Sequence, residues 1–381
     1  MKLLILVIGG ALVYLLQLLF FRLSWNRKLS ALVSFTDQIV DEGAETELLF
    51  RIENHKSLPV IALKTDIDAD SRLRFKDQNN LSISDKNYRS EIFSLKGHEA
   101  VERKLPLLCP KRGFYHVDGV DLVGTDLFYS RRFILHQESP SDICVLPGKA
   151  DPRKLLAASQ KMMGDIIVKN SDMLDPFTFR GIRQYQPFDP IRDINWKASA
   201  RTGDLRVNIR DYSSDQELGI ILDSSWDALL RPDALIEESI RIACGLSEEI
   251  LASGISCSLV SNGRDVLTGE RVRLDAGGDM EHARSIKYSL ARLEIPAVSD
   301  QNSTLDLLDE LIFRTVQNPG RRISWILIST QACDELISRW NKLSELSSGS
   351  FWVYPCFSLK DSSTLQSRIP ELIPWEVAYG K

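Results

Sequence analysis

Residues 179–207 concentrate side chains that could do chemistry, in a chain whose formal net charge is −5. Tyr185 and Trp196 lie among cations and carboxylates in this stretch. Its charged residues are Arg180, Arg183, Arg192, Lys197, Arg201, Arg206, Asp189, Asp193 and Asp204. A local excess of cations next to aromatic rings is typical of sites that recognise acidic groups.

Asp189 and Asp193 are the two carboxylates of this stretch that could serve as a general acid and a general base. Neighbouring arginines favour the ionised form of both groups and lower their pKa values, which suits catalysis poorly. The sequence also contains no P-loop and no GxGxxG motif. We therefore expect a non-enzymatic protein with no small-molecule substrate.

Asp223, Ser225 and Asp227 form a second candidate site directly after the apolar run LGIIL. Carboxylate and hydroxyl oxygens are the ligands that Mg²⁺ and Ca²⁺ prefer. The spacing is similar to the D-x-S-x-S motif of von Willebrand factor A-type domains, with Asp227 in place of the second Ser. The alternative is that Asp223 and Ser225 cap the helix that follows.

The resemblance to that motif implies a further Thr and an acidic ligand from later loops. Where the acidic ligand is expected, the chain has Ser329 and Thr330, and Asp334 is the nearest carboxylate. We therefore expect a degenerate site for Mg²⁺ or Ca²⁺, and otherwise no cofactor.

The elements that position these residues alternate between apolar runs and amphipathic stretches after Pro147. Four runs predict buried parallel strands, at residues 218–223, 255–260, 323–329 and 351–356. Three stretches with apolar residues at helical spacing predict helices, at residues 234–251, 280–293 and 304–316. This alternation predicts a doubly wound α/β domain over residues 149–381, with its ligand site at the carboxyl ends of the strands.

Residues 30–148 have a different pattern, in which short alternating runs are separated by turn residues. Such a pattern predicts a small antiparallel β-sandwich. The six cysteines are widely spaced and several lie in apolar runs, so we expect buried free thiols and no zinc cluster.

Residues 3–21 carry no charge and are long enough to cross a bilayer as a helix. A cleaved signal peptide is the alternative, but such peptides have a shorter apolar core and a small-residue cleavage site. Arg22, Arg27 and Lys28 follow the run, which favours a cytoplasmic location for the rest of the chain. We assign residues 1–29 to a single-pass anchor.

Taken together, these motifs resemble the bacterial "domain of unknown function 58" family over residues 1–330. The pattern G-x-R-x-Y-x-x-x-D-x-x-R-x-I-x-W-x-x-x-A-R carries the resemblance, together with KRGFYHVDGVDLVGTDLF, ICVLP and GIILDSS. The matching positions are Gly181, Arg183, Tyr185, Asp189, Arg192, Ile194, Trp196, Ala200 and Arg201. The family implies a membrane anchor, a β domain and a von Willebrand factor A-like domain. Members often have two membrane helices and a fuller metal motif.

Family members commonly accompany MoxR-type AAA+ ATPases. The resemblance therefore implies a chaperone-like or assembly function at the bacterial inner membrane, with a MoxR-type ATPase as the protein partner. Residues 179–207 then have two interpretations. They clamp the β domain onto the sheet, with Tyr185 and Trp196 packed beneath Arg–Asp pairs, or they dock an acidic partner through cations such as Lys197, Arg206 and Arg210.

Two further alternatives remain at the level of sequence. One is a cell-envelope adhesion module that binds its ligand through the cation loop. The other is binding of anionic lipid or nucleic acid by the mid-chain cations, which would show a steep salt dependence. The pI of 5.7 argues against general nucleic-acid binding.

Overall fold

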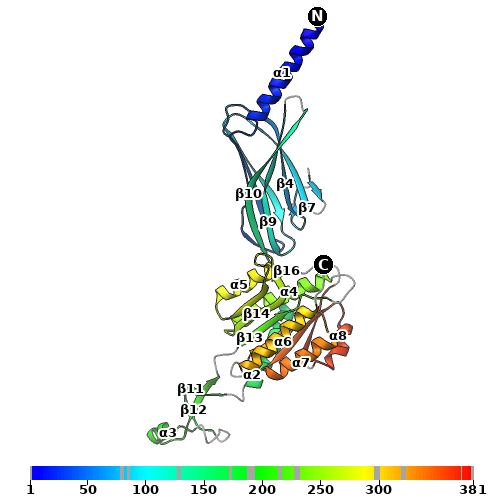
Figure 1. Cartoon of the computed structure of the whole chain (residues 1–381). Coiled ribbons are helices and arrows are strands. Elements are labelled where there is room, and N and C mark those ends of the chain that lie inside the picture. The colour runs from blue at the N-terminus through cyan, green and yellow to red at the C-terminus, as the bar shows by residue number, and fades with distance from the viewer. Residues whose placement is uncertain are drawn as a thin grey trace. The chain divides into compact units, whose positions relative to one another are not determined.

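The computed structural model shows a mixed α/β chain with an N-terminal apolar helix (Figure 1). It divides into two compact units, residues 1–148 and 149–381. The residues that the structure describes are 2–77, 81–83, 86–126, 130–170, 174–186, 194–212, 217–226, 232–295, 301–318, 323–369 and 371–378.

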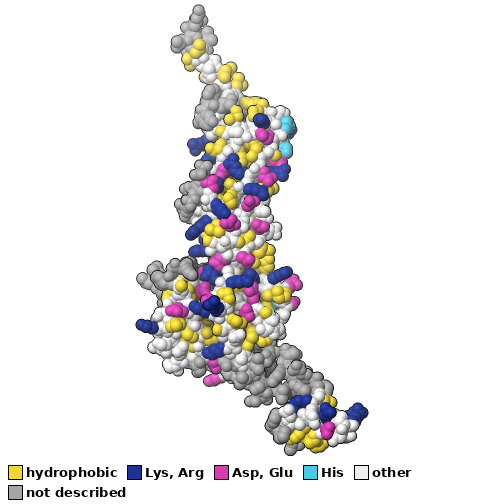
Figure 2. All heavy atoms as spheres, turned by 180° about the vertical axis from the view of Figure 1, so that it is seen from behind, with side chains coloured by type: hydrophobic (Ala, Val, Ile, Leu, Met, Phe, Trp, Pro, Cys, Tyr) yellow, Lys and Arg dark blue, Asp and Glu magenta, His cyan; other side chains and the backbone are white. Residues whose placement is uncertain are grey.

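Helix α1 (Lys2–Ser24) is apolar over its whole length until Arg22. Its window Leu6–Ser24 has a mean hydropathy of 2.0, and none of its residues is fully buried. Figure 2 shows hydrophobic side chains along the described part of the helix. The helix is therefore long and apolar enough to cross a membrane, as an anchor or a signal sequence does.

The first unit continues as two facing sheets in the predicted sandwich-like arrangement. One sheet contains, in spatial order, β1 (Leu29–Phe35), β3 (Glu45–Asn54), β8 (Glu99–Leu108) and β5 (Arg74–Phe75). The other contains β2 (Ile39–Asp41), β10 (Arg132–Leu146), β9 (Gly113–Thr125), β4 (Val60–Asp70), β7 (Lys86–Leu95) and β6 (Leu81–Ile83). All described pairings are antiparallel except that of β2 with β10.

Buried and more exposed residues alternate along these strands, as the two-residue period of a strand requires. The buried residues of both sheets form one core between them. Phe50 and Phe93, one from each sheet, stack with ring centroids 5.4 Å apart. Two facing sheets that share such a core are each stabilised by the other's apolar face.

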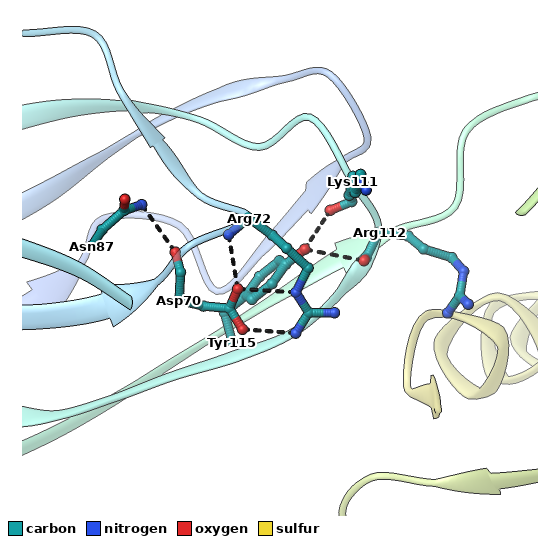
Figure 3. A network of polar contacts seen from close by, with 6 residues as sticks. All are labelled: Asp70, Arg72, Asn87, Lys111, Arg112 and Tyr115. Carbon is teal, nitrogen blue, oxygen red and sulfur yellow. Dashed lines mark hydrogen bonds and ion pairs between the residues drawn. The ribbon is translucent and has the colours of Figure 1, made fainter. Parts of the chain in front are cut away.

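One loop end of the sandwich is fixed by polar contacts around Tyr115 (Figure 3). The Tyr115 hydroxyl lies 2.8 and 3.1 Å from the carbonyl oxygens of Lys111 and Arg112. The Arg72 guanidinium lies 4.8 Å from the centroid of the Tyr115 ring, and Asp70 holds it through two hydrogen bonds of 2.9 and 2.7 Å. The β8–β9 loop is thus tied to the β4–β5 turn.

The second unit is built on one sheet with the order β15 (Arg271–Gly277), β14 (Ser256–Asp265), β13 (Glu217–Leu222), β17 (Ile323–Ile328), β18 (Ser350–Cys356) and β19 (Leu372–Glu376). A short strand, β16 (Leu293–Glu294), also pairs with β14. β14, β13, β17, β18 and β19 are parallel to one another, and β15 and β16 pair with β14 in the antiparallel direction. The four strands predicted from apolar runs are therefore confirmed as buried parallel strands.

Helices cover both faces of this sheet. Ile220 and Leu222 of β13 belong to a core that includes α2 (Pro152–Asn170), α4 (Asp233–Ala252) and α5 (Met280–Ala291). Ile221 belongs to a second core with α6 (Gln301–Gln317) and α7 (Asp334–Leu346), and Leu365 of α8 (Leu359–Gln366) packs against it. Because alternate residues of β13 face different helices, a sequence that is apolar at every position suits this strand.

A two-stranded sheet of β11 (Leu174–Gln184) and β12 (Arg206–Tyr212) contains most of the described mid-chain stretch. The short helix α3 (Trp196–Thr202) precedes β12. Ile194, just before this helix, forms a bridge with Val207, and both residues are buried. This hairpin was not predicted from the sequence.

All six cysteines are free thiols, and five of them are buried, as expected. Burial raises the pKa of Cys257 to about 12 and that of Cys109 to about 11. These thiols therefore stay protonated and unreactive at neutral pH.

Candidate functional site

Three polar residues lie at one level of the sheet, two directly after the ends of β13 and β17 and one inside the neighbouring β14. The register pairs Leu222 with Ser261 on one side and with Ile328 on the other. The next residues along these strands are Asp223, Asn262 and Ser329. If the strands of the main path are numbered by their order in the chain, their spatial order is 3-2-1-4-5-6, so β13 and β17 flank the point where this order reverses. Sites in open α/β sheets lie at that point.

Asp223 is the centre of a buried hydrogen-bond network and is 1% exposed. Its Oδ1 accepts hydrogen bonds from Ser225 N and Oγ at 2.9 and 2.6 Å, from Thr304 Oγ1 at 2.7 Å and from Asn262 Nδ2 at 3.1 Å. Its Oδ2 accepts one from Ser329 Oγ at 2.7 Å. Burying a carboxylate is costly unless it is hydrogen-bonded, and these donors offset that cost.

Asn262 links the network to the loop after β13. Its Oδ1 accepts from the backbone N–H and the hydroxyl of Ser224, each at 2.8 Å, while its Nδ2 lies 2.8 Å from Thr304 Oγ1. Thr304 lies in the first turn of α6, which begins at residue 301. Neither Asn262 nor Thr304 was identified from the sequence.

The described donors do not fit a divalent cation well. Among the described residues, Asp223 is the one carboxylate of the network, and the hydroxyls of Ser225, Thr304 and Ser329 already donate to it. Across the part of the chain that the structure describes, there is no cluster of three or more His, Cys, Asp or Glu side chains placed to hold a metal. Asp227, the second predicted carboxylate, lies outside the described residues.

One sequence-based alternative at this site is corrected, and the nearest later carboxylate lies apart from the site. Asp223 and Ser225 do not cap the next helix, because α4 begins at Asp233 and its N-cap is Pro232. Asp334 does not reach the site, because its side chain is 86% exposed and pairs with Arg368 at 2.7 Å. Asp334 is instead the first residue of α7.

The other candidate site, within residues 179–207, is α3 and its flanks, where local hydrogen bonds shape the chain. The Asn195 side chain accepts from Ala198 N at 2.9 Å, as an N-cap does, and Gly203 ends the helix with φ +79°. Ser199 Oγ accepts from Arg206 N at 2.8 Å, and Asn195 N donates to Arg206 O at the same distance. The helix is therefore anchored to the start of β12.

The side chains of α3 are presented outward. Trp196 is 64% exposed, and Lys197 and Arg201 are exposed beside it. Lys197 and Arg201 are four residues apart, so they share one face of the helix. This position of Trp196 differs from the packing expected under the clamp interpretation, because no residue of α3 is buried. Figure 2 shows Lys and Arg side chains around hydrophobic ones over this hairpin.

The other candidate residues of positions 179–207 lie on the hairpin or outside the described residues. Arg183 and Tyr185 are half-buried, and Arg183 Nη1 donates to Gln184 O at 3.1 Å. Arg206 is half-buried with its Nε lacking a hydrogen-bond partner among the described residues. The side chain of Arg180 is not described, and the same holds for Arg210; Asp189, Arg192 and Asp193 lie outside the described residues.

No family model matches this chain, and no curated protein matches it. Solved structures with some similarity include the CARDB domain of a Pyrococcus furiosus protein in complex with di-metal ions, at 12% identity, 32% coverage of this chain, 90% coverage of that chain and a TM-score of 0.22. A non-cellulosomal cohesin from Archaeoglobus fulgidus has 10% identity, covers 31% and 91%, and has a TM-score of 0.21. An ASH/PapD-like domain of human CEP192 has 15% identity, covers 32% and 87%, and has a TM-score of 0.21. At these TM-scores, the similarities carry no argument about function.

Proposed function

We propose that the chain is a membrane-anchored, non-enzymatic interaction protein of the "domain of unknown function 58" type. In this proposal α1 is the anchor and the second unit is a von Willebrand factor A-like domain that docks a protein partner. The partner that the family resemblance suggests is a MoxR-type AAA+ ATPase.

The arrangement around Asp223 supports the von Willebrand factor A-like assignment. Asp223 and Ser225 follow the central strand of a mostly parallel sheet with helices on both faces. A threonine from a later segment, Thr304, hydrogen-bonds to Asp223. An Asp-x-Ser pair joined by a Thr at this edge is the pattern that the family resemblance implies.

The observation that carries the docking proposal is the exposure of Trp196 beside the two cations of α3. A large aromatic side chain in water leaves apolar area that a partner can bury, and Trp and Arg are enriched among interface anchors. Lys197 and Arg201 supply the positive charge, so the partner surface that fits is acidic. We name Trp196, Lys197 and Arg201 the α3 face.

The anchor and its orientation follow from the charges at the two ends of α1. Arg22, Arg27 and Lys28 follow the apolar run, against Lys2 and the terminal amine before it. By the positive-inside rule, both units then face the cytoplasm of a bacterial inner membrane, where an ATPase partner is available.

The test is co-purification of the full chain from gently solubilised native membranes, with partners identified by mass spectrometry. The variant Lys197→Glu/Arg201→Glu reverses the charge of the α3 face, and Trp196→Ala removes its aromatic anchor. The matched control is Lys342→Glu/Lys360→Glu, which reverses two exposed cations on α7 and α8.

We expect an AAA+ ATPase to co-purify with the wild type and the control, and to be lost from both α3-face variants while their circular dichroism is unchanged. Recovery of the ATPase with all variants would place docking elsewhere on the chain. Recovery of secreted envelope proteins in its place would contradict the cytoplasmic orientation.

A further inference from the structure

The carboxyl end of α1 is packed onto one end of the sandwich, which we name the α1 end. Trp25 is 8% exposed and stacks on Phe21, with ring centroids 6.4 Å apart and planes 8° from parallel. Phe133 of β10 packs against Phe21 at 5.5 Å and against Trp25 at 6.3 Å. Gly124 leaves room for the indole, since a Cβ there would lie 2.5 Å from Trp25 Cε3.

Lys56, from the β3–β4 loop, holds the last carbonyl groups of the helix. Its Nζ donates to Trp25 O at 2.6 Å and to Ser24 O at 3.3 Å. A cation at this position satisfies carbonyls that a helix end leaves without a partner and complements the helix dipole. Burial lowers the pKa of Lys56. The helix and the sandwich therefore meet through specific contacts.

The turn between β9 and β10 also lies beside α1. The hydroxyls of Tyr14 and Ser130 are 2.8 Å apart. Tyr14 lies ten residues before Ser24, roughly 15 Å along the helix axis. Asp126 shapes this turn, because its carboxylate accepts from Ser130 Oγ at 2.6 Å and from Arg131 N at 2.8 Å. A span that holds Tyr14 in the bilayer therefore brings the turn into contact with the bilayer.

The α1 end is basic, in contrast to the chain as a whole. It consists of the described residues 22–29, 53–59, 96–99, 126 and 130–133, which contain seven Lys or Arg and three Asp or Glu. Six of the seven cations are exposed: Arg22, Arg27, Lys28, Lys96, Arg131 and Arg132.

The three carboxylates of the α1 end already have partners within the sandwich. Asp126 is held by the turn described above, Glu53 pairs with Arg51 at 2.7 Å, and Glu99 accepts from Lys96 N at 2.6 Å. The hydrogen bond from Arg51 lowers the pKa of Glu53, so this carboxylate stays ionised and paired. The exposed charges of the α1 end that have no such described carboxylate role are therefore its six cations, and they give this surface a positive charge.

We propose that the α1 end is a lipid-binding surface that takes the phosphate groups of anionic phospholipids. This inference rests on the proposal that α1 is a membrane anchor. Cations directly beside an apolar span lie at the depth of the lipid phosphates and are attracted by anionic lipids. Exposed Leu58, 52% exposed in the β3–β4 loop, adds an apolar contact at the same end.

The experiment uses the full chain in lipid nanodiscs with a fluorescent NBD label at one introduced cysteine. Pro59→Cys labels the α1 end, Lys111→Cys labels the opposite end of β9, and Leu12→Cys labels the span. Each is made in a Cys333→Ser background, because the other five native cysteines are buried. The quenchers are lipids that carry a spin label at the headgroup or in the acyl chain. Nanodiscs contain phosphatidylcholine alone or mixed with phosphatidylglycerol.

We expect the label at position 59 to be quenched by headgroup spin labels in the mixed nanodiscs, and the label at position 111 to be unquenched. Most of the quenching at position 59 should be lost in phosphatidylcholine alone and in the variant Arg131→Glu/Arg132→Glu. The label at position 12 should be quenched by acyl-chain spin labels in every case.

Each of the other outcomes contradicts one part of the proposal. Quenching at position 12 without quenching at position 59 overturns the lipid-binding surface and leaves the anchor intact. Quenching at position 59 that is independent of phosphatidylglycerol and of the two arginines overturns the role of anionic headgroups. An unquenched label at position 12 contradicts the anchor itself, and with it the proposed function.

Discussion

The hydroxyl of Ser329 donates to Asp223 Oδ2 across 2.7 Å, joining the ends of two adjacent parallel strands. Ser329 lies where a von Willebrand factor A-like metal site is expected to have an acidic ligand. A neutral hydroxyl at this point gives the buried carboxylate a donor in place of a second negative charge. The described network around Asp223 therefore stabilises the sheet edge through hydrogen bonds.

Ser329→Ala removes this donor and leaves Asp223 Oδ2 without its described partner. We expect the free energy of unfolding to fall by about 1–3 kcal/mol, the cost of an unsatisfied buried acceptor. Tryptophan fluorescence during thermal unfolding measures this, because six of the seven tryptophans lie in residues 149–381. Ser363→Ala, which removes an exposed hydroxyl on α8, is the control and should leave the midpoint unchanged. Equal midpoints for the two variants would contradict a structural role of the Ser329 hydroxyl.

Chelation of divalent cations should leave the unfolding midpoint of the wild type unchanged, because the described network needs no ion. Ser329→Asp should behave differently, since it places a second carboxylate against Asp223 and like charges repel. We expect this variant to be destabilised in EDTA and restored by Mg²⁺ or Ca²⁺. The measurement is a thermal unfolding series with and without each cation. A wild type that loses stability in EDTA would show that a cation already occupies the site.

Gly219 lies in the centre of β13 beneath the Trp325 ring, where an added Cβ would come within 2.2 Å of Cζ3. Both residues are paired in the register of β13 and β17. Gly219→Ala should therefore destabilise the second unit by about 1–3 kcal/mol through overpacking. Gly278→Ala is the matched control, because nothing lies within 4 Å of its Cβ position. Denaturant unfolding compares the two, and an unaffected Gly219→Ala variant would mean that the indole moves freely.

Two histidines of the sandwich lie next to carboxylates on the neighbouring strand. They make the stability of the sandwich depend on pH. Hydrogen bonds from His116 to Asp142 and from His136 to Asp121 raise the pKa of each imidazole. A raised folded-state pKa contributes stability that is present below the unfolded value of about 6.5 and is lost as pH rises through the folded value. Hydrogen exchange of β9 and β10 peptides should therefore be slower at pH 6 than at pH 8 after correction for intrinsic rates.

The control for this pH effect is the double variant His116→Asn/His136→Asn. Its corrected exchange rates should differ less between the two pH values than those of the wild type. An unchanged pH difference in the variant would assign the effect to other groups.

The strands and helices of the second unit could be predicted where burial is extreme. The central strands are apolar at every position because helices cover both faces, which makes a run such as LGIIL conspicuous. The hairpin of β11 and β12 has no such signal. Its sequence mixes charged, aromatic and glycine residues, and α3 buries none of its residues, so no periodicity marks these elements.

The site around Asp223 was predicted in part for a similar reason. Asp223 and Ser225 follow an apolar run directly, so their position at a strand end could be inferred. Asn262 lies inside β14, which runs beyond the predicted end at residue 260, and Thr304 lies in the first turn of a helix. Their contact with Asp223 depends on register and on where α6 begins, which a single sequence does not specify.

The pairing of β13 with β17 sets an order for events during synthesis. Asp223 and Ser329 are 106 residues apart, so the central sheet stays incomplete until the ribosome has released residues near 330. The last strand of the sandwich ends at Leu146, long before that point. Domains generally fold as units from the N-terminus during translation. The sandwich and the helix packed on it are therefore complete while the parallel sheet is still being made.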